Sequence, residues 1–377
     1  MNVPYAGIPE RGKTTTAAGS EFCMKLAVVS YRYYFEADVF QSDRPEFQED
    51  RSTCFLRVLR ARLAERGVEL VHCDDAAPED TWGYLFINHN GKYLERLERA
   101  GYKGRLFLIV FESALIQPDN WLPENRSRYT AVFSWENPGG GSSSELPGRI
   151  LYFWPNPLSL AEQPLPFSER KKLCVLMAAN KWKRRPNELY TERFRAILWF
   201  MKHHPEDFDL YGYDWNISPA KKLVEHVRNA WRSFRGTQVR PIDVSPVYRG
   251  SVSVKKDILK NYRFCICYEN AENFPGYITE KIFDCFIAGV VPVYLGWDGA
   301  GRFIPEDTFV NKRRYPDYES LYNYLATMGD KEYNGYLDAI DRFLSSEKAM
   351  RFDVSSFVET LVEGMGLKRA QKESGEP

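Results

Sequence analysis

The chain has 377 residues, more than a single hydrophobic core usually serves, so we expect two domains. Its 51 basic and 51 acidic residues cancel, which argues against a nucleic-acid-binding or anionic-membrane-binding protein. A hydrophobic content of 44%, a charged content of 27% and the lack of any apolar run long enough to span a bilayer are typical of a soluble globular protein.

Residues 1–23 contain no apolar core of the kind that a secretory signal peptide needs. Within them, Gly19-Ser20-Glu21-Phe22 resembles translated restriction sites, so we interpret 1–23 as a vector-derived tag and Met24 as the natural start. The seven cysteines are an odd number without a CxxC pair, which indicates reduced thiols. We therefore expect a cytoplasmic protein, either free or peripheral on the inner face of the membrane. Its oligomeric state stays open.

The first domain, expected over residues 24–160, alternates strands with helices. Its expected strands cover residues 25–29, 68–72, 84–88, 105–111, 130–135 and 149–154, and its expected helices cover 52–66 and 93–100. The strand at 105–111 is apolar except for its first residue, which indicates a parallel sheet covered on both faces. The alternation predicts a doubly wound α/β domain. A proline-rich segment, 155–166, is interpreted as the linker to a second domain.

The second domain, expected over residues 161–345, repeats this alternation. Its expected strands are 171–177, 207–212, 264–268, 290–295 and 304–311, and its expected helices are 190–201, 223–231, 255–260, 280–288, 320–328 and 336–343. Residues 346–377 are expected to add a C-terminal helix and a polar tail.

The most informative stretch lies between residues 262 and 296. A polar loop after its first strand ends in Pro275-Gly276, Thr279 is expected to cap the following helix, and Gly289 is expected to end it. Lys281 falls in the first turn of that helix, where unpaired N–H groups and the helix dipole disfavour a cation. A bound anion such as a phosphate would explain this lysine, and so would a side chain that extends into water.

This stretch contains a long and specific sequence motif. Residues 262–270 read Y-R-F-C-I-C-Y-E-N, and G-Y-I-T-E-K and V-V-P-V-Y-L-G follow. The sequence resembles the donor-binding signature of the alpha-1,3/1,4-fucosyltransferases of bacterial type, glycosyltransferase family 10. The resemblance implies a GT-B fold, in which two Rossmann-like domains face a central cleft. It also implies an inverting transfer of L-fucose from GDP-fucose to the 3-hydroxyl of N-acetylglucosamine in an oligosaccharide acceptor, with no cofactor required.

The resemblance also assigns a general base. In the family this carboxylate lies in a short motif that ends a strand of the first domain, and Phe111-Glu112-Ser113 occupies that place here. Glu112 is therefore expected to take the proton from the acceptor hydroxyl. Ala114 departs from the family's proline, and a carboxylate at a strand end is otherwise an ordinary solvated turn residue.

The same resemblance assigns a set of residues to the donor: Arg193, Asn270, Tyr277, Glu280 and Lys281. Lys281 would hold a phosphate, and a second cation would lie at the start of the helix after the first strand of this domain. Arg193 fits that place best by spacing, and Arg195 is the alternative. Asn270 and Glu280 would bind ribose hydroxyls, and Tyr277 would line the sugar-diphosphate pocket.

The acceptor side is less defined. Aromatic residues follow the first strand and Glu112, and those that could face a sugar are Tyr31, Tyr33 and Trp121; packing beneath a loop is the alternative for each. A basic run, Lys312-Arg313-Arg314, stands where the family usually has acidic residues. It would either favour a charged acceptor or form an ordinary solvated surface.

Other chemistries find less support. Asp207-Phe208-Asp209 matches the metal-binding pattern of other glycosyltransferases, but this family does not depend on it, and the five histidines show no metal spacing. Asp74-Asp75 is interpreted as a turn. We find no GxGxxG after a strand, which argues against a nucleotide-binding oxidoreductase. Two alternatives remain: a GT-B enzyme with another nucleotide-sugar donor, and a non-catalytic GDP- or glycan-binding protein.

Overall fold

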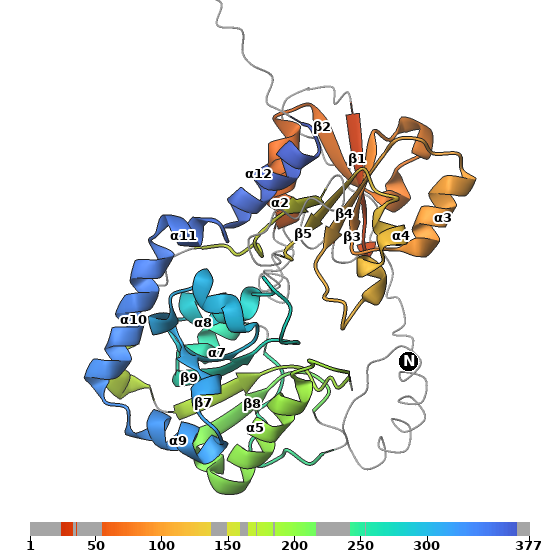
Figure 1. Ribbon diagram of the computed structural model, residues 1–377. Coiled ribbons are helices and arrows are strands. Elements are labelled where there is room, and N and C mark those ends of the chain that lie inside the picture. The colour runs from red at the N-terminus through yellow and green to blue at the C-terminus, as the bar shows by residue number, and fades with distance from the viewer. Residues whose placement is uncertain are drawn as a thin grey trace, which may run out of the picture.

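The computed structural model describes residues 24–32, 35, 55–136, 149–158, 165–170, 172–183, 185–215, 242–252 and 254–367. These residues form two parallel β-sheets, each covered by helices on both faces (Figure 1). The predicted α/β fold of two doubly wound, Rossmann-like domains, the arrangement called GT-B, is therefore confirmed. The interpreted tag at 1–23 and the expected helix at 223–231 lie outside the described residues.

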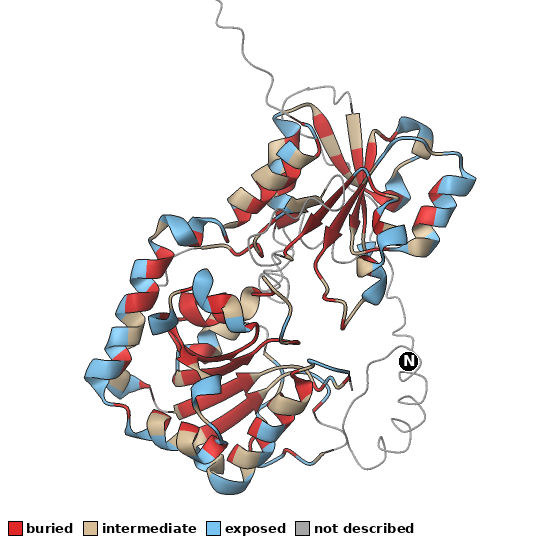
Figure 2. Ribbon diagram, in the orientation of Figure 1, coloured by how far each residue is buried: buried red, intermediate tan, exposed pale blue. Residues whose placement is uncertain are grey.

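The first sheet has the order β2-β1-β3-β4-β5-β6, and all its neighbours are parallel. Its strands are β1 (Met24–Val29), β2 (Val68–His72), β3 (Gly83–Ile87), β4 (Arg105–Val110), β5 (Ala131–Ser134) and β6 (Arg149–Leu151). Buried residues concentrate in these strands and on the inward faces of the helices (Figure 2). Because helices cover both faces, the inner strands β3 and β5 are buried along nearly their whole length and lack the apolar–polar alternation of half-exposed strands, whereas the edge strand β2 alternates between buried and half-buried residues.

Two helices cover opposite faces of this sheet. On one face, α2 (Phe55–Ala64) packs Leu56, Leu59 and Leu63 against alternate residues of the strands. On the other face, α3 (Gly91–Arg99) packs Leu94 and Leu97 against the intervening residues. A short helix, α4 (Pro123–Arg126), precedes β5.

The second sheet has the order β11-β10-β9-β7-β8, again with parallel neighbours. Its strands are β7 (Lys172–Met177), β8 (Phe208–Tyr211), β9 (Tyr262–Tyr268), β10 (Val291–Leu295) and β11 (Val310–Asn311). The order reverses between β7 and β9. In open α/β sheets a ligand site is expected at such a reversal, beyond the carboxyl ends of the strands.

The helices of the second domain also divide between two faces. The elements α5 (Tyr190–His203) and α9 (Tyr318–Thr327) share one apolar core with the sheet. The elements α7 (Lys255–Leu259), α8 (Glu280–Ile287) and α10 (Asp330–Leu344) share another. The short α11 (Glu347–Met350) follows α10.

The last described helix, α12 (Val354–Gly364), returns to the first domain and lies beside α2 (Figure 1). Its apolar side joins the core of the first sheet through Phe357, Val358 and Leu361. Glu359 pairs with the guanidinium groups of Arg62 and Arg66 at 3.1 and 3.3 Å. The C-terminal part of the chain therefore fastens the second domain back to the first.

One expected strand is wrong over most of its length. Of residues 304–311, only Val310 and Asn311 form β11, whereas Glu306–Thr308 make a turn of 3₁₀ helix. Pro305 explains the difference, because its carbonyl accepts both the backbone N–H of Thr308 at 3.1 Å and its hydroxyl at 2.6 Å. Those bonds close a turn, which an extended strand cannot accommodate.

Pro292 lies inside β10 opposite Cys265 of β9. Pairing with β11 begins only at Val293, so Pro292 lies where β10 has a single neighbour and one ladder bond fewer is needed.

Within the described part of the chain, no helix is both long and apolar enough to cross a membrane.

Candidate active site

A buried carboxylate joins the end of β9 to the start of α8. Glu269 follows β9 and is fully buried. Its two oxygens accept the backbone N–H of Thr279 at 2.8 Å and the Thr279 hydroxyl at 2.8 Å. Thr279 therefore occupies the expected N-cap position, but its hydroxyl does not cap the helix as predicted. The hydroxyl binds Glu269 instead, because a buried charge needs hydrogen-bonding partners.

Lys281 lies against this carboxylate. Its ammonium nitrogen is 2.9 Å from the Thr279 hydroxyl oxygen, 3.3 Å from a Glu269 oxygen and 3.3 Å from a Glu280 oxygen. Burial alone would lower the pKa of Lys281, but Glu280 and Glu269 outweigh burial and raise it above its ordinary range. The side chain thus does not extend into water. It is a fixed cation at the N-terminus of α8.

Three further donor-assigned residues are joined by hydrogen bonds at the end of β9. The Arg193 guanidinium donates to the Tyr268 carbonyl at 2.6 and 3.2 Å and to the Asn270 side-chain oxygen at 3.0 Å. The Asn270 amide in turn donates to the Tyr277 hydroxyl at 3.4 Å. The positive charge of Arg193 opposes part of the rise in the Lys281 pKa, so the two cations share one electrostatic environment.

The two arginines of α5 lie in different surroundings. Arg193 is buried and points toward the end of β9, whereas Arg195 is 68% exposed and pairs with Glu192 at 2.9 Å. Arg195 lines a separate polar pocket of about 360 Å³ with Glu188, Glu272 and other residues. Arg193 is therefore the arginine that can share an anion with Lys281.

Glu112 follows β4 of the first domain and lies near the same group. Burial raises the pKa of its carboxyl, while Lys281 and Lys181 act in the opposite direction. The negative charge of Glu280 raises the pKa further, so four ionisable groups from the two domains interact at one place. A carboxyl held in this way suits a general base, whose pKa should lie closer to neutrality than that of an exposed glutamate.

Aromatic rings hold the two domains together beside Glu112. Tyr277 of the second domain is fully buried against Trp135 and Trp154 of the first, with ring centroids 4.7 and 6.2 Å apart. Trp135 packs on Trp121 at 5.0 Å. The indole N–H of Trp135 donates to the Phe111 carbonyl at 3.0 Å, and that of Trp121 donates to the Glu112 carbonyl at 3.0 Å. The loop between β9 and α8, which carries Tyr277, thus packs in one core with the loop after β4, which carries Glu112.

The residues predicted for the acceptor are not brought together in the same way. Trp121 lies at the Glu112 loop, but its ring is occupied by packing on Trp135 and by the Arg126 guanidinium, 4.4 Å from the ring centre. Tyr31 follows β1 and is 79% exposed. Tyr33 lies outside the described residues. An acceptor role for these side chains stays a prediction.

The basic run after β11 is engaged within the chain. Arg313 pairs with Glu272 at 2.6 Å and donates to the Gly296 carbonyl at 2.8 Å. Arg314 pairs with Glu306, and Lys312 donates to the Tyr315 carbonyl at 3.1 Å. These partners favour a structural role over binding of a charged acceptor.

The aspartates of the metal-like pattern are likewise engaged. Asp209 is buried and accepts from the Tyr262 hydroxyl at 2.6 Å and from Arg249 at 2.7 Å. Asp207 accepts from the Tyr322 hydroxyl at 2.7 Å. Because the two carboxylates have separate partners, they do not converge on one ion.

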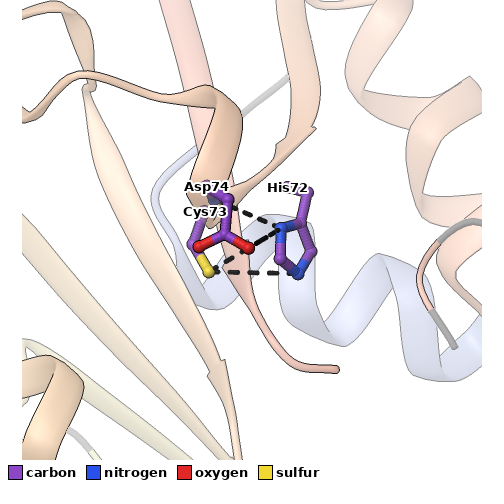
Figure 3. Close-up of side chains that lie close together, drawn as sticks. All are labelled: His72, Cys73 and Asp74. Carbon is purple, nitrogen blue, oxygen red and sulfur yellow. Dashed lines mark hydrogen bonds and ion pairs between the residues drawn. The ribbon is translucent and has the colours of Figure 1, made fainter. Parts of the chain in front are cut away.

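His72, Cys73 and Asp74 lie close together after β2 (Figure 3). The His72 Nδ1 accepts the Asp74 backbone N–H at 3.2 Å, and its Nε2 is 3.0 Å from the Ser30 carbonyl oxygen. Burial and the Asp74 charge raise the pKa of the Cys73 thiol. Both imidazole nitrogens thus have partners within the chain, and Asp74 and Asp75, the expected turn, lie in a turn of 3₁₀ helix over Cys73–Asp75.

The second-domain segment has known relatives. Residues 240–355 match the family model described as "Glycosyltransferase family 10 (fucosyltransferase) C-term". They contain the Glu269–Thr279–Lys281 contacts and four of the five donor-assigned residues. Residues 240–355 belong to glycosyltransferase family 10. The resemblance seen in the sequence is thereby confirmed.

Individual family 10 relatives match over short segments. The alpha-(1,3)-fucosyltransferase FucT of Helicobacter pylori is 29% identical over 90 residues, which cover 24% of this chain and 18% of that protein. The mouse alpha-(1,3)-fucosyltransferase 4 is 42% identical over 67 residues, covering 17% of this chain and 15% of that protein. The chain thus matches less than a fifth of the length of these relatives.

A solved structure described as alpha1,3-fucosyltransferase with GDP-fucose aligns with 96% of this chain and 95% of its own. The TM-score is 0.48 and the sequence identity 13%.

Sequence reasoning missed the central member of the site. Glu269 stands inside the Y-E-N motif, but a carboxylate directly after a strand usually marks a solvated turn. The signal that could have revealed it is Gly296, where an added Cβ would lie 2.8 Å from the Glu269 Cγ. The glycine leaves space for the Tyr294 hydroxyl, which would lie closer still to that Cβ, as well as for the Glu269 side chain.

We predict that Glu269→Gln lowers the free energy of unfolding by about 1–3 kcal/mol, because the amide cannot accept both Thr279 bonds and leaves Lys281 with one carboxylate fewer. Urea denaturation of the whole chain measures this. Glu272→Gln is the matched control: it removes a charge in the same loop, but its half-buried pair with Arg313 contributes less than about 1 kcal/mol. Equal stability losses in both variants would contradict the prediction.

Proposed function

We propose that the protein is an inverting fucosyltransferase that transfers L-fucose from GDP-fucose to the 3-hydroxyl of N-acetylglucosamine in an oligosaccharide acceptor. The observation that carries the proposal is the packing of Trp135, which donates to the Phe111 carbonyl beside the half-buried Glu112, on Tyr277 of the family 10 segment in the other domain. The names of the relatives, alpha-(1,3)-fucosyltransferases, support the sugar and the linkage.

The chemistry is a displacement at the anomeric carbon of fucose. The acceptor oxygen forms the new bond as the carbon–oxygen bond to GDP breaks, and Glu112 takes the hydroxyl proton. GDP leaves with the bonding electron pair, so negative charge grows on its terminal phosphate. Lys281 and Arg193 are fixed cations beside that position and stabilise the charge without having to reorganise.

The donor contacts follow from groups already in place. Arg193 uses Nε and Nη2 to bind the chain, which leaves Nη1 to donate to a phosphate oxygen, since the described residues offer it no partner. Lys281 has three oxygen neighbours, so a phosphate would replace one of them. Glu280 is the neighbour that can turn away, because its carboxylate is assigned to a ribose hydroxyl.

The first test replaces the base. Glu112→Gln should reduce fucose transfer to N-acetyllactosamine by about 10²- to 10⁴-fold, since an amide cannot take the proton. The affinity for GDP, measured by calorimetry, should not fall, because removing a negative charge near Lys281 does not weaken the binding of a phosphate. Glu124→Gln, an exposed glutamate of the same domain, is the control and should keep full activity. Turnover by Glu112→Gln at the wild-type rate would remove Glu112 from the mechanism.

The proposal also predicts a pH dependence. Glu112 acts as a base only when ionised, and burial raises its pKa, so activity should fall as the pH drops through a value above the ordinary glutamate range. Lys181 stabilises the ionised form, so Lys181→Met should move this acid limb of kcat/KM to higher pH. Lys202→Met, an exposed lysine at the end of α5, should not move it.

A limb that stayed in place in Lys181→Met, or moved to lower pH, would show that the titrating group is not Glu112.

Hydrolysis of a panel of sugar nucleotides tests the donor in the same preparation. Faster turnover of a donor other than GDP-fucose would favour a GT-B enzyme of different specificity. Binding of GDP without any transfer would favour the non-catalytic alternative.

A further inference from the structure

The geometry points to Asn88 as a positioning residue that fixes the place of Glu112. The inference rests on the proposed function, because it assumes that Glu112 is the base. Asn88 follows β3, the strand adjacent to β4, and its backbone N–H donates to the Ile109 carbonyl at 2.8 Å. It thus stands directly beside the point where β4 ends and the Glu112 loop begins.

The side-chain oxygen of Asn88 binds the backbone of that loop. It accepts the N–H of Phe111 at 2.9 Å and the N–H of Glu112 at 2.9 Å. It also accepts the side-chain amide of Asn120 at 2.9 Å. Beyond the end of β4, this one side-chain oxygen therefore replaces the β3 carbonyls as the acceptor of the backbone N–H groups.

The other side of the Glu112 peptide is held as well. Its carbonyl accepts the Asn120 amide at 3.2 Å and the Trp121 indole at 3.0 Å. Asn120 is fully buried, and its oxygen accepts the His89 N–H at 2.7 Å. Both backbone polar groups of Glu112 are thus bound by side chains, so the carboxyl group projects from a fixed peptide.

The backbone of Asn88 is unusual in a way that supports this role. Its φ is 63°, in the left-handed region that costs most residues free energy and that asparagine tolerates better than most. The turn directs the side chain back onto β4. Aspartate would offer the same acceptor oxygen but would add a negative charge beside Glu112 and raise its pKa. The neutral amide binds the loop without this effect.

A purely structural role would predict lost stability and nothing else, so the test must separate the two. Asn88→Gly removes the side chain but permits the positive φ without strain. Asn90→Ala is the matched control, because its side-chain oxygen also accepts a backbone N–H, that of Tyr93, at 3.1 Å in the same loop. That bond caps α3 and does not involve Glu112.

We expect Asn88→Gly to reduce kcat for fucose transfer by about 10- to 100-fold, with KM for GDP-fucose unchanged, since a displaced base costs rate rather than donor binding. In the Glu112→Gln background the same change should cause no further loss. Hydrogen exchange of the Glu112 amide should become faster in Asn88→Gly and stay unchanged in Asn90→Ala.

Asn88→Asp provides the second arm, because it keeps the acceptor oxygen and tolerates the positive φ. It should move the acid limb of kcat/KM to higher pH, as expected from the added negative charge. An unmoved limb in Asn88→Asp, or wild-type kcat in Asn88→Gly, would overturn the inference. If instead Glu112→Gln itself retained full activity, the proposed function would fail at its base, an outcome that these variants distinguish.

Discussion

The rest of the site depends on the interactions of one buried group, the Glu269 carboxylate. A fully buried charge is tolerated only when its hydrogen bonds and its countercharge are in place. Glu269 obtains both from the start of α8, through the N–H and hydroxyl of Thr279 and the ammonium of Lys281. The end of β9, the first turn of α8 and the Lys281 cation are therefore fixed as one unit.

The contacts between the domains extend this unit to Glu112. Tyr277 belongs to the loop that Glu269 anchors, yet its ring is buried in the core of the first domain against Trp135. Lys183, from the loop after β7, donates to the Ile116 carbonyl of the first domain at 3.2 Å. Together with α12, which returns to α2, these contacts hold the carboxylate of one domain near the cations of the other.

Much of the fold was predictable because its signals are local. Both sheets are parallel and covered on both faces, so strands such as 84–87 and 106–110 appear as short apolar runs, and most elements were placed within a few residues. Two expectations were wrong, one for a local reason and one for a tertiary reason. Pro305 closes a turn inside an expected strand, and the Thr279 hydroxyl binds Glu269 because that carboxylate is buried. Local sequence shows neither the burial of Glu269 nor the position of Asn88 beside β4, since both arise from neighbouring strands.

Calorimetric titration of GDP and GMP tests the central claim, that Lys281 is a fixed cation for the terminal phosphate of a diphosphate. The account predicts that the wild-type chain binds GDP more tightly than GMP, by about 10- to 100-fold for a charge-assisted contact of 1.5–3 kcal/mol. Lys281→Ala should lose most of this preference, whereas Arg195→Ala should keep it. An undiminished preference for GDP in Lys281→Ala would contradict the account.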